Sequence, residues 1–308
     1  AASDVYKRQE LASGLSRVGE SWELSGMPGS ESVVAEGPWA GSTLSELIGR
    51  FGAELLGKAN YARFGQEFPL LVKFIDARED LSIQVHPDDE LARKRHGKSG
   101  KCEMWYVLEA EPGASLLTGF SRPIAPAEYE RRVADNTLTD VLNRQAIASG
   151  DVFYLPAGRV HSIGKGSFIV EIQQSSDITY RIYDFDRRDA AGNSRELHTE
   201  LAREAIDFES SENSRITYAP ENNQEVRLVT TPYFTTSLYT LTARTRCDWS
   251  ATDSFVAIVL LQGSGSLTDN EGNRIDVRQG ETWLLPASTQ WTEITPHTAP
   301  LRLLTSRI

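Results

Sequence analysis

The 308-residue chain contains only two cysteines, Cys102 and Cys247, which lie far apart and match no metal-binding or redox spacing. We therefore expect two inert buried thiols rather than a disulfide. No apolar run approaches the roughly 18 residues that a membrane span requires. The first nine residues, AASDVYKRQ, include neither an initiator methionine nor the apolar segment of a signal peptide. We expect residues 1–9 to be a non-native remnant and the protein to be cytoplasmic.

Positive charge is also scarce. The 32 Lys and Arg residues are outnumbered by 43 Asp and Glu residues, which gives a formal net charge of −11. This balance argues against nucleic acid or an anionic membrane as a partner, because both require a basic surface. A small phosphorylated molecule is still a possible ligand if a few cations are gathered locally. We expect a monomer or a weak homo-oligomer with a small-molecule substrate.

Short β-strands are the commonest predicted element. Alternating or fully apolar runs predict strands at 70–75, 81–85, 103–108, 152–155 and 167–173, and almost everything after Glu225 has the same character. Thr43 and Glu46 form a capping box that opens an amphipathic helix. Further short helices are predicted at 89–95, 127–133 and 199–208.

An internal repeat organises these strands. Residues 150–161 read GDVFYLPAGRVH and residues 280–291 read GETWLLPASTQW, so the two segments align without gaps at an offset of 130 positions. The second copy has Trp291 where the first has His161. The repeat predicts a catalytic module at 10–219 and a metal-free module at 226–308, with a linker at 220–225.

The first copy also resembles a known signature. Its pattern Gly150-x5-Pro156-x-Gly158-x2-His161 is similar to the second signature of the cupin superfamily. The resemblance implies a mostly β fold of two tandem cupin (jelly-roll) barrels, with a helical insertion associated with the first.

Four side chains form a candidate metal site. Gln84 and His86 are two residues apart, which places both on one face of a strand, and His161 ends the repeat segment. Glu103 opens the next strand. Two imidazoles, one carboxylate and one amide oxygen suit a single Zn²⁺ ion per chain. Two His and one carboxylate also describe a non-haem Fe(II) site, so the ligands alone leave iron open.

Cations lie near these ligands in the sequence. Lys101 precedes Glu103 by two residues, and Arg181 follows His161 by twenty residues. Lys73 lies on the predicted strand 70–75, which precedes the strand of Gln84. Glu171 lies on the strand before Arg181. Simpler alternatives are that Arg181 pairs with Asp184 or Asp186 and that Lys73 lies at a strand edge. We expect no site role for the remaining histidines, His96, His198 and His297.

Taken together, these motifs resemble the type I mannose-6-phosphate isomerases, and most closely their short bacterial form. The matching segments are SIQVHPD at 82–88, Lys101-x-Glu103, LPAGxxH at 155–161 and Glu171-x9-Arg181. The resemblance implies zinc ligation by Gln84, His86, Glu103 and His161. It also implies that Arg181 is an active-site arginine, Lys73 and Lys101 contact substrate, and Glu171 is a second active-site acid.

The implied reaction interconverts mannose 6-phosphate and fructose 6-phosphate through a cis-enediol, with Glu171 or a metal-held water as the base. Two alternatives remain from the sequence. The first is an Fe(II) cupin oxygenase, which has less need for Lys101 and Arg181. The second is a non-catalytic sugar-phosphate-binding cupin, which has less need for an intact ligand set.

Overall fold

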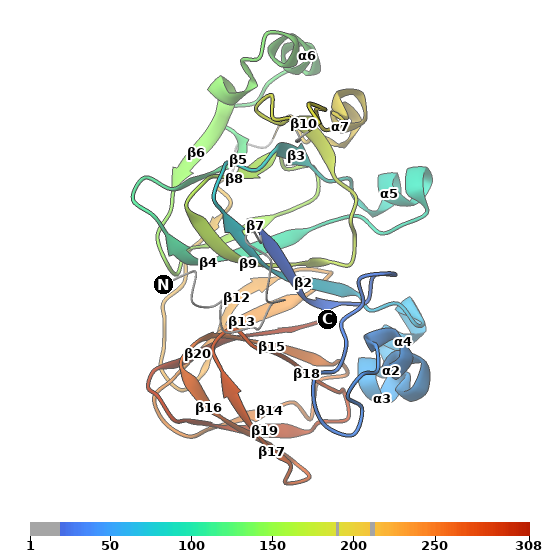
Figure 1. The fold of residues 1–308 in the computed structure, drawn as a ribbon, viewed down its shortest axis with the longest axis vertical. Helices are drawn as coiled ribbons and strands as arrows, with labels where there is room; N and C mark the ends of the chain where they lie inside the picture. Colours follow the sequence, from blue (N-terminus) through green and yellow to red (C-terminus); the bar gives the residue numbers. More distant parts are fainter. Residues whose placement is uncertain (1–18, 189–190, 210–212) are drawn as a thin grey trace. The chain divides into compact units, whose positions relative to one another are not determined.

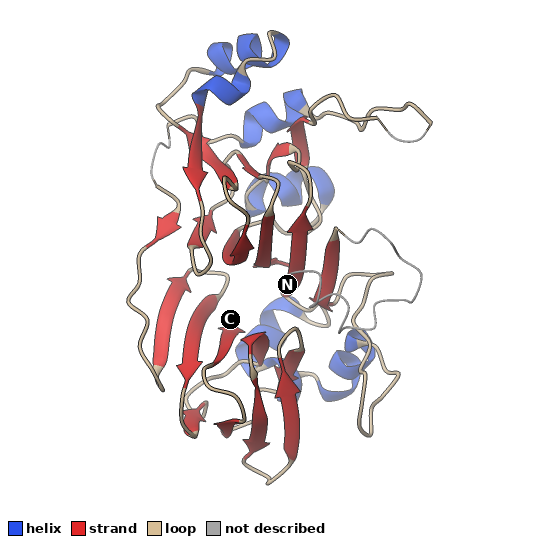
Figure 2. Ribbon diagram, turned by 60° about the vertical axis from the view of Figure 1, so that its left-hand side comes forward, coloured by secondary structure: helices blue, strands red, loops and turns tan. Residues whose placement is uncertain are grey.

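The computed structural model describes residues 19–188, 191–209 and 213–308; the predicted remnant at 1–9 lies outside these ranges. The described chain forms two compact units. One contains Trp22–Lys73 and Thr217–Ile308, and the other contains Gly19–Ser21 and Phe74–Ile216. Strands dominate both (Figure 2). The mostly β prediction is confirmed.

The compact units do not follow the linear division suggested by the repeat. Trp22–Lys73 is grouped with the C-terminal strands, and the division runs through β1 (Glu20–Ser25) and β2 (Leu70–Ala77). The predicted boundaries at 219 and 226 therefore stay a prediction about sequence modules.

The unit formed around Phe74–Ile216 contains two antiparallel sheets (Figure 1). The first runs from the second half of β2 through β9 (Ser167–Gln174), β4 (Glu103–Ala110), β7 (Val152–Leu155) and β11 (Arg215–Ile216). The second has the order β10 (Tyr180–Tyr183), β3 (Ile83–Val85), β8 (His161–Ile163), β5 (Ser115–Phe120) and β6 (Leu142–Ala146). Apolar side chains from both sheets meet in one buried cluster that includes Trp105, Leu116 and Ile163.

Helices cover the outer face of the second sheet. The predicted helices are present as α5 (Asp89–His96), α6 (Pro126–Ala134) and α7 (Thr199–Ala205), the last ending three residues before the predicted bound. Together with the 3-10 helix η1 (Leu138–Val141), α6 is the helical insertion, and it lies between β5 and β6.

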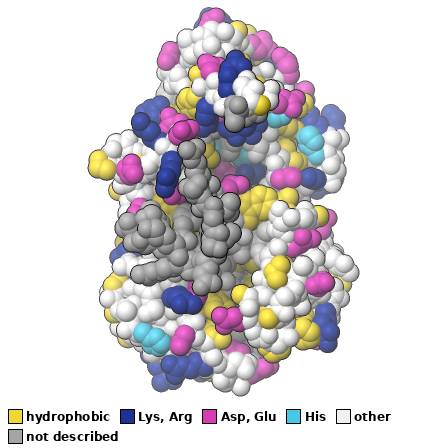
Figure 3. All heavy atoms as spheres, viewed as in Figure 1, with side chains coloured by type: hydrophobic (Ala, Val, Ile, Leu, Met, Phe, Trp, Pro, Cys, Tyr) yellow, Lys and Arg dark blue, Asp and Glu magenta, His cyan; other side chains and the backbone are white. Residues whose placement is uncertain are grey.

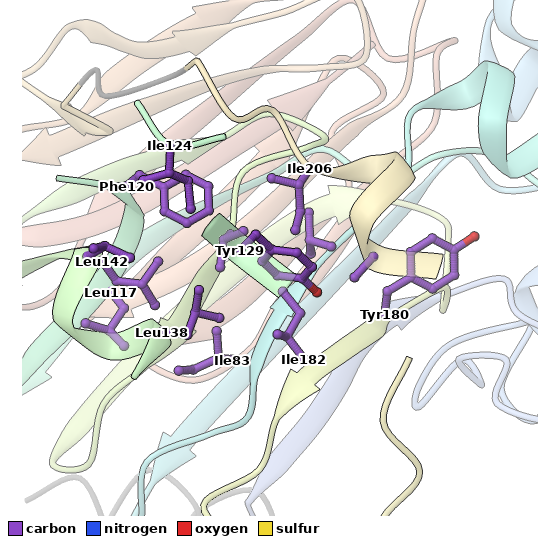
Figure 4. Packing of buried hydrophobic residues seen from close by; sticks show 14 of the residues in the cluster. Ile83, Leu117, Phe120, Ile124, Tyr129, Leu138, Leu142, Tyr180, Ile182 and Ile206 are labelled. Atoms are coloured by element: carbon purple, nitrogen blue, oxygen red, sulfur yellow. The ribbon is translucent and has the colours of Figure 1, made fainter. Parts of the chain in front are cut away.

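A second apolar cluster joins these helices to the sheet (Figure 4). Ile83 on β3 and Tyr180 and Ile182 on β10 pack in it with Tyr129 of α6. Because side chains alternate along a strand, Gln84 and Arg181 point to the opposite face of the same sheet. The residues on either side of Gln84 and of Arg181 are buried in this cluster, and their burial fixes the direction of the two site residues.

The other unit has a similar strand order, without counterparts of β10 and β11. Its sheets have the orders β12-β13-β20-β15-β18 and β14-β19-β16-β17. The strands are β12 (Glu225–Thr230), β13 (Thr235–Leu241), β14 (Thr245–Asp248), β15 (Val256–Gln262), β16 (Ser264–Asp269), β17 (Arg274–Arg278), β18 (Thr282–Leu285), β19 (Trp291–Pro296) and β20 (Leu301–Arg307). β15 lies between β20 and β18 just as β4 lies between β9 and β7. β18 and β19 begin 130 positions after β7 and β8, which confirms the predicted repeat. That each sheet pair closes as a barrel remains our interpretation.

Three short helices belong to this second unit: α2 (Leu44–Phe51), α3 (Ala53–Leu56) and α4 (Lys58–Phe64). The capping box at α2 is present, with Glu46 N donating to Thr43 Oγ1 and Thr43 N donating to the Glu46 carboxylate. Among the residues that the structure describes, no helix is long and apolar enough to cross a membrane. Acidic and basic side chains are interspersed on the face shown in Figure 3.

Candidate metal centre

Three predicted ligands converge from three strands of the unit formed around Phe74–Ile216. His86 directly follows β3, Glu103 opens β4 and His161 opens β8. All three are buried, and their ligand atoms lie within 4.8 Å of one another. His161 Nε2 is 3.0 Å from Glu103 Oε1, and His86 Nε2 is 3.5 Å from Glu103 Oε2. One carboxylate therefore lies between two imidazoles.

Backbone carbonyls fix the orientation of both rings. His86 Nδ1 lies 2.8 Å from the carbonyl oxygen of Ile178, and His161 Nδ1 lies 2.7 Å from that of Arg159. A carbonyl can only accept, so each Nδ1 must carry the proton. Each Nε2 then directs its lone pair at the cluster, which is the arrangement that metal-binding histidines require.

The cluster has the chemistry of a cation site. Within the described ranges, His86 Nε2 and Glu103 Oε1 are buried and form no hydrogen bond, and the only cation beside Glu103 Oε2 is the Lys101 ammonium, 3.1 Å away. Unsatisfied buried polar atoms are costly, and a divalent cation would satisfy all of them at once. No second group of three or more His, Cys, Asp or Glu suited to a metal occurs in the described part of the chain.

The electrostatics keep these ligands in the forms that bind a metal. Burial, with the nearby Lys101 ammonium, lowers the pKa of His86 to about 3, so this ring is neutral at physiological pH. Burial alone would raise the pKa of Glu103, but Lys101 and the two histidines outweigh it and hold the pKa well below its ordinary value. The site thus presents neutral imidazole and ionised carboxylate.

Gln84 reaches the same cluster. It lies directly opposite His161 in the β3–β8 pair, and its Nε2 is 3.4 Å from His161 Nε2. Its Oε1 accepts a hydrogen bond from Ser82 Oγ at 3.3 Å. In this orientation the amide nitrogen faces the cluster, so ligation by the oxygen requires a 180° rotation of the amide.

Lys101 and Glu171 lie beside the cluster. Lys101 Nζ is 3.1 Å from Glu103 Oε2, and the carboxylates of Glu103 and then Glu171 outweigh burial to raise the pKa of Lys101. Glu171 is buried on β9 directly opposite Trp105, and its Oε2 accepts a hydrogen bond from the indole Nε1 at 2.9 Å. A buried cation and a buried acid are therefore both held close to the candidate ligands.

Arg181 is directed to the same face of the sheet. It lies opposite Gln84 in the β10–β3 pair, and its Nη1 donates to the carbonyl of Glu196 at 3.2 Å. Burial, with the nearby Arg195, lowers its pKa. It forms no ion pair with Asp184, which is bound instead by Arg187 and Arg195.

Lys73 is grouped with the other unit. It is buried, and its ammonium lies 5.1 Å from the centroid of the Trp22 ring. A substrate contact by Lys73 remains a prediction.

Sequence reasoning missed Trp105, which connects two parts of the site. Its indole donates to Glu171, and its ring meets His161 edge-on, with centroids 5.4 Å apart. The strand alternation contained the signal, because Trp105 follows Glu103 by two residues and so shares its face. The carbonyls of Ile178 and Arg159 had no comparable signal.

Known proteins resemble this chain over most of its length. Residues 11–117 match the family model described as phosphomannose isomerase type I, catalytic domain. A mannose-6-phosphate isomerase of Streptococcus mutans is 35% identical over 269 residues, covering 87% of this chain and 82% of the relative. The chain belongs to the type I mannose-6-phosphate isomerase family. ManA of Bacillus subtilis is another family member, with 35% identity over 274 residues, 88% of this chain and 84% of that protein.

The fold of the family is also matched. The crystal structure of the Bacillus subtilis mannose-6-phosphate isomerase superposes with a TM-score of 0.84 at 31% identity, covering 94% of this chain and 90% of that one. The family membership predicted from the motifs is therefore confirmed. The buried cluster of His86, Glu103 and His161 is the candidate metal centre of this chain.

Proposed function

We propose that this protein is a zinc-dependent isomerase that interconverts mannose 6-phosphate and fructose 6-phosphate through a cis-enediol. The observation that carries this proposal is the buried cluster of His86, Glu103 and His161, whose ligand atoms lie within 4.8 Å of one another. Two of these atoms, His86 Nε2 and Glu103 Oε1, form no hydrogen bond in the described chain. Membership in the family supports the substrate, and the adjacent cations Lys101 and Arg181 suit a phosphorylated sugar.

His86, Glu103 and His161 would hold the ion, with Gln84 as a fourth ligand once its amide is rotated. When bound, zinc would act as a Lewis acid toward the substrate's neighbouring carbonyl and hydroxyl oxygens. The Nδ1–carbonyl hydrogen bonds keep both imidazoles aimed at that position in the absence of substrate.

The reaction transfers a proton between C2 and C1 of the sugar without net redox change. Glu171 is our candidate for the group that removes and returns this proton, because it is a buried carboxylate held by the Trp105 indole. Lys101 and Arg181 would offset the negative charge of the enediolate or the phosphate. Arginine is suited to phosphate because its guanidinium can bind two oxygens at once.

The test is direct. Purified protein is incubated with fructose 6-phosphate, with and without a chelator, and mannose 6-phosphate is followed. We expect turnover in the metal-replete sample, loss after chelation and recovery with zinc. Absence of turnover in the metal-replete sample would overturn the proposal.

The metal requires its own measurement, since His, Glu and His also suit Fe(II). Elemental analysis of protein purified without added metal should give one zinc per chain. Reconstitution of the chelated protein with Zn²⁺ or Fe²⁺ then compares the isomerase rates. An iron-loaded protein that isomerises only with iron would contradict the zinc assignment while leaving the isomerase activity in place.

A further inference from the structure

His198 holds the backbone of Arg181 at two points. Arg181 N donates to His198 Nδ1 at 3.1 Å, and His198 N donates to the carbonyl of Arg181 at 2.6 Å. β10 is the edge strand of its sheet, so this outer side of Arg181 has no neighbouring strand. Residues separated by seventeen positions thus form a reciprocal pair that takes the place of a strand neighbour.

The hydrogen bonds to His198 also determine how Arg181 pairs with β3 on the other side of β10. The N–H and C=O of one residue in a strand point the same way, and those of Arg181 point to His198. Arg181 and Gln84 are therefore a non-hydrogen-bonded pair of the β10–β3 ladder, the type in which opposite side chains approach more closely. The arginine is brought toward a candidate metal ligand.

The interaction needs one particular form of the His198 ring. Because Nδ1 accepts a hydrogen bond, the ring must be neutral with its proton on Nε2. Nε2 lies 3.8 Å from the carboxylate of Glu196, whose backbone carbonyl accepts from Arg181 Nη1 at 3.2 Å. The segment 196–198 therefore contacts Arg181 at its amide, its carbonyl and its guanidinium.

We infer that His198 is a positioning residue that holds Arg181 against the metal centre through its neutral Nδ1. The inference rests on the proposed function for the role of Arg181, whereas the contact itself can be measured without activity. The titratable or charged groups that face His198 are Glu196, Arg181 and the ring of Tyr180, whose centroid is 6.4 Å away. Protonation of the ring would turn Nδ1 from an acceptor into a donor and break the bond to the Arg181 amide.

Two substitutions of His198 separate this role from simple packing. His198→Asn places an amide oxygen where Nδ1 accepts, whereas His198→Ala removes the acceptor. We expect His198→Ala to lower kcat/KM roughly tenfold or more, because small displacements of a positioned group are costly to rate. We expect His198→Asn to stay within about threefold of the wild type, and zinc content to be unchanged in both. His297→Ala, which alters an exposed histidine of the other unit, is the matched control.

Hydrogen exchange of the Arg181 amide gives a readout that does not depend on catalysis. Exchange should be faster in His198→Ala than in the wild type, and near wild-type in His198→Asn.

Several results would overturn the inference. They are wild-type kinetics and exchange in His198→Ala, an equal loss in His198→Asn and His198→Ala, or faster exchange of the Arg181 amide in His198→Asn than in the wild type. The last comparison uses only the wild type and His198→Asn, so it tests the contact between His198 and Arg181 even where His198→Ala does not fold. If the wild type shows no isomerase activity, the proposed function fails, but the exchange experiment still tests the contact.

Discussion

Arg181 lies directly opposite Gln84 across the antiparallel pair of β10 and β3. Both side chains point away from the apolar cluster that contains their strand neighbours Ile83 and Ile182. The candidate substrate cation and the candidate metal ligand are thus fixed by the same two strands. Substitution of either side chain should leave the two strands intact, because neither packs in the apolar cluster. The roles of Arg181 and Gln84 can therefore be tested separately.

Arg181→Ala should keep the metal but lose turnover. The guanidinium contacts none of His86, Glu103 or His161 in the described structure, so zinc content should equal that of the wild type. We expect kcat/KM to fall roughly 10²- to 10³-fold, the usual cost of removing a preorganised cationic or hydrogen-bonding group. Elemental analysis and steady-state kinetics with fructose 6-phosphate check both parts.

His161→Ala is the contrasting variant, because it removes a ligand and should lose the metal itself. Arg181→Lys keeps the charge without the planar fork and should recover only part of the rate. Normal activity in Arg181→Ala would remove this residue from the mechanism.

Trp105→Phe should lower kcat with little effect on KM or zinc. Phenylalanine keeps an aromatic ring beside His161, but it cannot donate the hydrogen bond to Glu171. If Glu171 transfers the proton, loss of its orienting donor should reduce kcat roughly tenfold and shift the pH–rate profile, whereas Glu171→Gln should cost about 10²- to 10⁴-fold.

Trp283→Phe provides a matched control. Trp283 lies in the other unit, and its indole also donates to a glutamate, Glu281, at 3.2 Å. Its substitution should leave the kinetics unchanged. Equal losses in the two tryptophan variants would mean that Trp105 acts through stability alone.

Much of the site could be predicted from the sequence, because strand alternation and the repeat are local patterns. Gln84 and His86 are two residues apart, which places them on one face of the strand. The repeat aligns His161 with Trp291, which shows that only the first module has a metal-binding side chain at this position. These relations depend only on short-range geometry. The same alternation also predicts that Trp105 shares the face of Glu103.

The remaining features depend on contacts between distant residues. The carbonyl of Ile178 orients His86 across 92 positions, and every residue has a carbonyl, so the sequence gives no signal for this contact. Grouping Trp22–Lys73 with the C-terminal strands depends on similar contacts. Phe68 packs on Phe255 with centroids 4.7 Å apart, and the Asp253 carboxylate accepts from Lys58 N at the start of α4.

Gly57→Ala should destabilise the unit that contains α2, α3 and α4. Gly57 joins α3 to α4 with φ of +93°, and an added Cβ would lie 2.2 Å from the carbonyl oxygen of Asp253. Strain and collision together should reduce the free energy of unfolding by about 3 kcal/mol or more. Gly37→Ala has a similar φ of +85° but open space around the new atom, so it should cost about 1 kcal/mol. Urea unfolding measures both, and equal losses would mean that the contact with Asp253 is unimportant.

The metal-free protein should lose stability as the pH falls below about 6.5. The folded-state pKa of His86 is about 3 against an ordinary 6.5, so the unfolded chain binds a proton that the folded one excludes between these values. Glu103, whose pKa is lowered from 4.5, acts in the same direction and loses its contribution as the pH falls through its folded-state pKa. The free energy of unfolding should therefore decrease on acidification, by at most about 1.4 kcal/mol per pH unit for each proton. Urea titrations of chelated protein at several pH values should show a shallower dependence in His86→Gln than in the wild type, with exposed His297→Gln following the wild type. Parallel curves for all three proteins would show that His86 is protonated freely in the fold and that its burial does not control the acid stability.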